Sequence, residues 1–155
     1  MRRIAIITLV VFGFTATVAV AANVHFKPGS PTFTVGTTTL TVSGTLAGLG
    51  NEDLTITVTA TGTATTEGFN PAGHSVPGHP ATVTVIGNQP ISASEVKNGE
   101  VFFSVTTPQP PTPTAKQAGF PNNNWTVVVT GVTFTSATIT VVQGGEVVLT
   151  FSKTF

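Results

Sequence analysis

A strict alternation of apolar and hydroxyl-bearing residues between positions 54 and 65 most constrains how this chain can fold. Leu54, Ile56 and Val58 fall on even positions, and threonine occupies every odd position from Thr55 to Thr65. A period of two places the two sets on opposite faces of a β-strand, one packed and one hydrated. No stretch beyond residue 21 shows the three-and-four spacing of an amphipathic helix. The pattern therefore predicts an all-β protein.

Further runs of the same kind predict about seven or eight strands. They span residues 32–35, 37–42, 81–86, 101–106, 125–134, 137–142 and 147–155. With 31 Thr and 22 Val, about a third of the chain consists of two β-branched residue types that favour strands. Short strands separated by Gly, Asn and Pro clusters are typical of an antiparallel β-sandwich. We expect a sandwich that is immunoglobulin-like in architecture.

The first 21 residues have the features of a secretory signal peptide. Arg2 and Arg3 precede a charge-free stretch from Ile4 to Val20, and Ala19-Val20-Ala21 supplies the small residues that signal peptidase requires. A membrane anchor is the alternative, but about 17 apolar residues are marginal for a span. We therefore predict a signal peptide at 1–21 and a single β-sandwich domain at 22–155. The mature protein is expected to be secreted, extracellular or periplasmic, without membrane insertion after cleavage.

The composition excludes several classes of function. Only 8% of the residues are charged, and removing residues 1–21 leaves four lysines against six carboxylates. Without a basic patch, a nucleic-acid partner is not expected. The chain has no cysteine, so thiol chemistry and disulfides are impossible. Neither a Gly-x-Ser-x-Gly motif nor a facing pair of carboxylates is evident, so we expect neither an enzyme nor a bound cofactor.

Two histidines are the weak candidates for a metal site. His74 and His79 stand five residues apart in a loop rich in Gly and Pro, and imidazole nitrogens bind transition metals. A catalytic zinc ion needs a third protein ligand, and Glu67 and His25 are the nearest candidates. Nothing in the sequence brings either of them close. We therefore expect two exposed loop histidines and assign no metal, and the binding residues remain unknown.

Two long segments rich in Pro and Gly, residues 67–80 and 108–124, interrupt the strands. Both are longer than ordinary hairpin loops, and long loops often carry function. The alternative is that they are plain connections that cross between the sheets.

The alternating apolar residues before Phe155 raise the possibility of a small outer-membrane barrel. Against that reading, the chain has one Trp and no Tyr to form aromatic girdles, and Lys153 would interrupt a lipid-facing band. The many Thr-x-Thr pairs raise the possibility of ice binding, but they follow no fixed period.

Three separated segments of the chain are distinctive together, namely Phe69–Gly78, Ser94–Gly99 and Phe120–Val141. In this order they resemble a family of small, uncharacterised secreted bacterial all-β proteins. The resemblance implies no transferable activity. It implies cysteines where this chain has Phe69 and Phe120, and amide side chains where it has His74 and His79. An aromatic contact between Phe69 and Phe120 is therefore expected in place of a disulfide.

The parity of the apolar residues makes two predictions about β-sheet register. Val132 and Phe134 are even whereas Ile139 is odd, so a bulge or a tight bend is expected at 135–137. After Gly144-Gly145, burial of one apolar face requires Val141 to pair with Leu149, and we expect a three-residue loop, residues 144–146.

These observations predict a secreted, non-catalytic β-sandwich of the cell surface or extracellular matrix, with a structural or weak binding role. Its expected partner is a cell-surface polymer or protein. The alternative is a carbohydrate-binding module, for which Trp125 or a phenylalanine would have to supply the aromatic platform.

Overall fold

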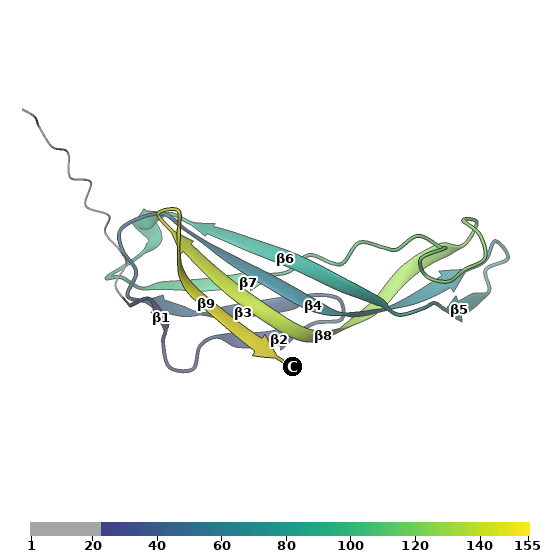
Figure 1. Ribbon diagram of the computed structural model, residues 1–155, viewed down its shortest axis with the longest axis horizontal. Helices are drawn as coiled ribbons and strands as arrows, with labels where there is room; N and C mark the ends of the chain where they lie inside the picture. The colour runs from purple at the N-terminus through teal and green to yellow at the C-terminus, as the bar shows by residue number, and fades with distance from the viewer. Residues whose placement is uncertain (1–22) are drawn as a thin grey trace, which may run out of the picture.

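The structure, a computed structural model, describes residues 23–155, so the expected signal peptide lies outside the described residues. Nine β-strands form two antiparallel sheets that pack face to face, and the predicted all-β sandwich is confirmed (Figure 1). Its one helical segment within these residues is the short 3₁₀ helix η1 (Ala93–Glu95).

The smaller sheet is centred on a single strand, β3. Strand β7 lies along one side of β3, and β2 and β1 follow each other along the other side. The four strands are β1 (His25–Phe26), β2 (Thr32–Val35), β3 (Leu40–Ala47) and β7 (Val101–Thr106).

The larger sheet is centred on β4, which pairs with β8 on one side and with β6 and then β5 on the other. Strand β9 pairs with the far edge of β8. The five strands are β4 (Leu54–Phe69), β5 (Ser75–Pro77), β6 (Ala81–Ile91), β8 (Thr126–Gln143) and β9 (Glu146–Thr154).

The main core lies between the two sheets and follows the predicted alternation. The even-numbered residues of β4 are buried, Ile56 and Val58 fully, whereas its odd-numbered threonines face outward. Thr66, at an even position, is also buried. Leu40 and Phe103 of the smaller sheet and Ile139 of β8 are also fully buried. Burial of such side chains contributes about 1.5–3 kcal/mol each, so this cluster supplies most of the stability of a domain without cross-links.

The bulge predicted at 135–137 is confirmed. Thr61 pairs with Ser136 and the next residue of β4, Gly62, pairs with Phe134, which leaves Thr135 as the extra residue. The bulge shifts the side-chain phase by one, so Phe134 and Ile139 are both buried on the same face. Because the shift does not end the strand, the two runs expected at 125–134 and 137–142 form one strand.

The register predicted for the last hairpin is also confirmed, but the predicted loop is wrong. Val141 pairs with Leu149 and Ile139 pairs with Phe151. The turn itself has two residues, Gly144 and Gly145, both with positive φ, and the register shifts between Val142, which pairs with Val147, and Val141. A two-residue turn in which both residues have positive φ matches the right-handed twist of the two strands. The bulge next to it then returns the apolar side chains of β9 to the same face as those of β8.

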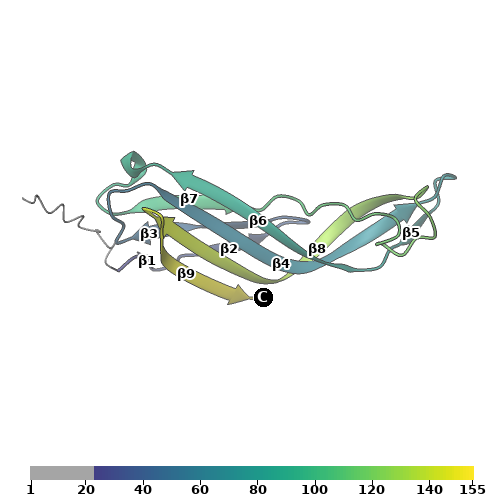
Figure 2. The same cartoon turned by 45° about the horizontal axis from the view of Figure 1, so that its top comes forward.

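Strands β4 and β8 extend well beyond the smaller sheet and form an arm (Figures 1 and 2). We use "arm" for residues 65–69 of β4, residues 126–131 of β8, strand β5 and the loop at 108–125. The segment 67–80 is therefore only partly irregular, because it contains the end of β4 and the strand β5. A second bulge at Thr130, between the pairs Thr65–Gly131 and Thr66–Val129, lies where the arm begins.

One side of the sandwich is closed by a close approach of β6 to β7. A Cβ atom at Gly87 would lie 2.8 Å from the carbonyl oxygen of Thr106 and 2.9 Å from a methyl group of Val105. Nearby, the Gln89 Oε1 atom accepts a hydrogen bond of 2.9 Å from the Ser104 backbone N–H. Position 87 therefore requires a residue without a side chain.

We predict that Gly87→Ala lowers the free energy of unfolding by about 1–3 kcal/mol, because the added methyl forces the two strands apart. Chemical denaturation followed by circular dichroism measures the loss. Gly50→Ala is the matched control, since its Cβ would meet Gln143 at an ordinary 3.6 Å, and its effect should stay within about 0.5 kcal/mol. Equal stability of the two variants would contradict the close approach.

Candidate functional site

The arm has a small core of its own, built around Phe120. This side chain is buried, and its ring stacks on that of Trp125 with centroids 4.9 Å apart and planes 8° apart. Ala115 and Ala118 complete the cluster, and Val127 packs against it from β8. The proline-rich loop is therefore anchored by a side chain and does not cross the surface loosely.

A glycine of β4 and one just after β5 make room for the Phe120 ring. A methyl group at Gly68 would overlap the ring, and one at Gly78 would approach it to 3.2 Å. The loop is also held by its backbone, because the Ala118 carbonyl oxygen accepts a 2.9 Å hydrogen bond from the His79 N–H. The proline-rich loop is thus held on the arm by the Phe120 ring, which packs directly on the backbone at Gly68.

The expected contact between Phe69 and Phe120 is wrong. Phe120 stacks on Trp125, and Phe69 belongs to none of the aromatic pairs found within residues 23–155. Phe69 is the last residue of β4, next to Gly68, so its half-buried side chain points to the opposite face of the strand. The spacing of Trp125 five residues after Phe120, across an Asn-rich turn, was the signal that sequence reasoning missed.

The two candidate histidines lie apart from any metal-binding group. His74 is exposed in the turn between β4 and β5, where its backbone N–H donates a 2.9 Å hydrogen bond to Asn70 Oδ1. His79 is also exposed, with its ring over Gly119. Between residues 23 and 155, no three His, Asp or Glu side chains are placed to hold one metal ion.

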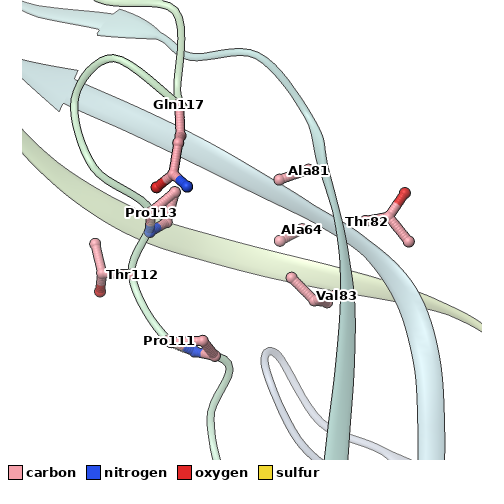
Figure 3. Close-up of a pocket in the computed structure, with 8 residues that line it drawn as sticks. All are labelled: Ala64, Ala81, Thr82, Val83, Pro111, Thr112, Pro113 and Gln117. Carbon is pink, nitrogen blue, oxygen red and sulfur yellow. The ribbon is translucent and has the colours of Figure 1, made fainter.

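A pocket of about 310 Å³ lies where the proline-rich loop passes over β4 and β6 (Figure 3). The loop residues Pro111 and Pro113 face Ala64 and Val83 across it. The full lining is Ala64, Ala81, Thr82, Val83, Pro111, Thr112, Pro113 and Gln117. This lining carries no charge and no nucleophile beyond threonine hydroxyls, so it offers shape and weak polarity but no catalytic group.

The outer face of the larger sheet carries an array of hydroxyl groups. Register aligns Thr57 of β4 with Asn88 of β6 and with Thr140 of β8. Neighbouring side chains pair across strands, since Asn88 Oδ1 accepts a 2.8 Å hydrogen bond from Thr57 Oγ1 and the Thr138 and Ser152 hydroxyls lie 3.0 Å apart. On this face, none of the odd-numbered residues from Thr55 to Thr63 of β4 is charged, and neither are their partners on β6, β8 and β9.

The outer face of the smaller sheet repeats the arrangement. The hydroxyls of Thr41 and Thr106 lie 2.9 Å apart, and those of Thr32 and Ser43 lie at the same distance. Phe102 interrupts the array and is 64% exposed. Both broad faces of the sandwich are therefore neutral and rich in hydroxyl groups.

Phenylalanines cover the side of the sandwich opposite β6 and β7. The Phe33 ring of β2 lies 5.7 Å from that of Phe155 and 6.4 Å from that of Phe151, and Phe26 lies 5.6 Å from Phe151. The Lys153 Nζ atom lies 4.7 Å from the centre of the Phe33 ring, within range of a cation–π interaction. Phe151 and Phe155 therefore join the edges of the two sheets.

Comparisons with known proteins add no relative. No family model matches the chain, and neither the curated proteins nor the solved structures gave a match. Within the described residues, the structure contains no helix of the length and apolarity needed to cross a lipid bilayer.

We predict that Phe120→Ala destabilises the arm by about 3 kcal/mol, because it removes a buried ring and leaves a cavity. The single Trp of the chain, Trp125, loses its stacked neighbour, so its fluorescence emission should shift to longer wavelength. Denaturant unfolding followed by this fluorescence measures both effects. Phe69→Ala is the control and should cost less, about 1–2 kcal/mol, since that ring is partly exposed and stacks on no other ring. A larger loss for Phe69→Ala than for Phe120→Ala would contradict the packing described above.

Proposed function

We propose that this protein is a secreted, non-catalytic β-sandwich that acts as a scaffold at the cell surface or in the extracellular matrix. It contacts neutral polymers or protein partners weakly through its broad faces. The observation that carries the proposal is the chemistry of those faces, which present threonine and serine hydroxyls in register without a charged side chain among them.

A hydroxyl array of this kind is suited to many weak contacts. Several hydroxyls already pair with each other across strands, so a ligand only exchanges one hydrogen bond for another. Such exchange gives little affinity per contact. Because no ion pairs take part, binding of this kind is insensitive to salt.

The distribution of charge supports the same proposal. The ion pair between Lys27 and Glu100, 2.9 Å apart, lies at one end of the sandwich. Glu52 and Asp53 lie in the turn before β4, and Glu146 is the first residue of β9, next to the hairpin turn at the same end. The broad faces therefore have no electrostatic preference for nucleic acid or for a charged membrane surface.

The proposed export rests on the sequence of residues 1–21 and on the resemblance to small secreted bacterial proteins. A fold that is held by its core without a disulfide does not depend on the redox state of its compartment.

We predict that the full-length chain, expressed in a bacterial host, is recovered outside the cytoplasm with Ala22 or Asn23 as its first residue. Cell fractionation with N-terminal sequencing tests this. The double variant Ala21→Arg/Ala22→Arg is the matched variant, since a bulky cation directly before either cleavage point should leave the precursor unprocessed. An intact N-terminus in the cytoplasmic fraction would overturn the proposed location.

A carbohydrate-binding module is the second candidate, and the position of Trp125 favours it. This ring lies outside the main core, partly exposed just before β8 begins in the arm, and Phe120 supports one of its faces. A supported, partly exposed indole is able to stack on the apolar face of a sugar ring.

For this candidate we predict that soluble neutral oligosaccharides change the fluorescence of Trp125 in a saturable titration, with a response that is independent of salt. Because the chain has a single Trp, the signal reports on this site alone. Phe102→Ala, which removes an exposed ring on the smaller sheet, should leave the titration unchanged. A flat titration with every oligosaccharide would exclude Trp125 as a sugar platform.

A further inference from the structure

One edge of β8 has no strand beside it in the arm. Strand β9 ends at Thr154, which pairs with Ser136, whereas β8 begins ten residues earlier, at Thr126. Figures 1 and 2 show β9 stopping near the middle of the molecule while β8 continues into the arm. Among residues 23–155, only β4 pairs with positions 126–131 of β8, so the opposite edge is open.

The open edge is confined to a short segment. The Phe155 N–H donates to the Thr135 carbonyl oxygen at 3.0 Å, and the Val132 N–H donates to the Thr37 carbonyl oxygen at 2.8 Å. Other parts of the chain therefore cover the edge from residue 132 onward. Within the part of the chain that the structure describes, no loop forms a backbone hydrogen bond to residues 126–131 from that side.

This segment has none of the features that usually protect an edge strand. Natural edges carry lysines, prolines or inward-pointing charges that prevent pairing with another chain. Residues 126–131 read Thr-Val-Val-Val-Thr-Gly, without charge or proline, and the whole stretch from 117 to 145 is free of charged side chains. Five of the six residues are β-branched types that favour strands.

The segment is also complementary to itself, because Thr126-Val127-Val128-Val129-Thr130 reads the same in both directions. Two antiparallel copies aligned at Val128 place Val127 opposite Val129 and Thr126 opposite Thr130. Like β-branched residues then face each other on both sides of the sheet, an arrangement that stabilises strand pairs. A twofold axis at Val128 gives the isologous contact that is usual in homodimers.

We propose that the open edge of β8 binds a second copy of this chain, with residues 126–130 of the two copies pairing antiparallel about Val128. The larger sheets of the two molecules then form one continuous sheet that joins them arm to arm. The pairing is independent of where the protein acts. Since it covers five residues per chain, the contact is small and the dimer is of the weak, concentration-dependent class.

Solution size tests the proposal with protein that begins at Ala22. Sedimentation velocity over a range of concentrations should show a monomer–dimer equilibrium. Val128→Lys places two cations opposite each other at the centre of the contact and should raise the dissociation constant by about tenfold or more. The Val128 side chain is 38% exposed and Glu67 lies directly opposite on β4, so the lysine is tolerated in the folded monomer.

Val35→Lys is the matched control, because Val35 is 53% exposed on the edge strand β2, away from the arm. It should leave the dissociation constant unchanged. Circular dichroism confirms that both variants keep the fold. A wild-type protein that stays monomeric at every concentration overturns the proposal, and so does a dimer that Val128→Lys leaves intact.

Disulfide cross-linking tests the register, since the chain has no cysteine of its own. Facing residues of an antiparallel pair have Cα atoms about 4.5–5.5 Å apart, within the range of a disulfide. Val128→Cys should therefore give covalent dimers under mild oxidation, as should the double variant Thr126→Cys/Thr130→Cys. Thr126→Cys alone should not, because its copies lie about 13 Å apart. Cross-linking of Thr126→Cys at the same rate as Val128→Cys would overturn the register.

Discussion

The side-chain phase of β4 is the constraint on which the rest of the structure depends. This strand pairs with β5, β6 and β8, so its even positions decide which face of the larger sheet becomes the core. A slip of one residue would exchange its buried aliphatic side chains for threonines. The bulges of β8 at Thr130 and Thr135 follow from the same constraint, because they keep the apolar residues of β8 on the face that β4 has set.

Most of the sandwich could be predicted from the sequence because alternation is a local property that burial enforces. The parity change between Phe134 and Ile139 was enough to locate a bulge, and the residues around Gly144 were enough to set a register. Gln143 is a buried residue that alternation of apolar side chains does not predict. It follows Ile139 and Val141 on the core-facing side of β8, but its side chain is polar. Its amide forms hydrogen bonds with the backbones of Gly50 and Glu52, about 90 positions away in sequence.

The arm was predicted less well for a related reason. Gly68 and Gly78 give no apolar signal, yet they create the space that Phe120 fills. Their loop-like composition hid the continuation of β4 to Phe69, and with it the face to which each side chain points. The pairing of Phe120 with Trp125 depends on the path of the intervening turn, which alternation does not describe. The histidines were correctly expected in exposed positions, because polar residues in a loop rich in Gly and Pro lack an apolar surface to cover them.

The length of the β4–β8 pairing has a consequence for how the chain reaches its fold. Partners along this ribbon, from Phe69 with Thr126 to Leu54 with Gln143, are roughly 60–90 residues apart in sequence. Such contacts form only after a large loop has closed, so folding of this topology is expected in the range of milliseconds to seconds. A chain that folds slowly stays unfolded for longer after synthesis, which would suit the export proposed above. The long β4–β8 pair, which makes the molecule elongated, is therefore also expected to slow its folding.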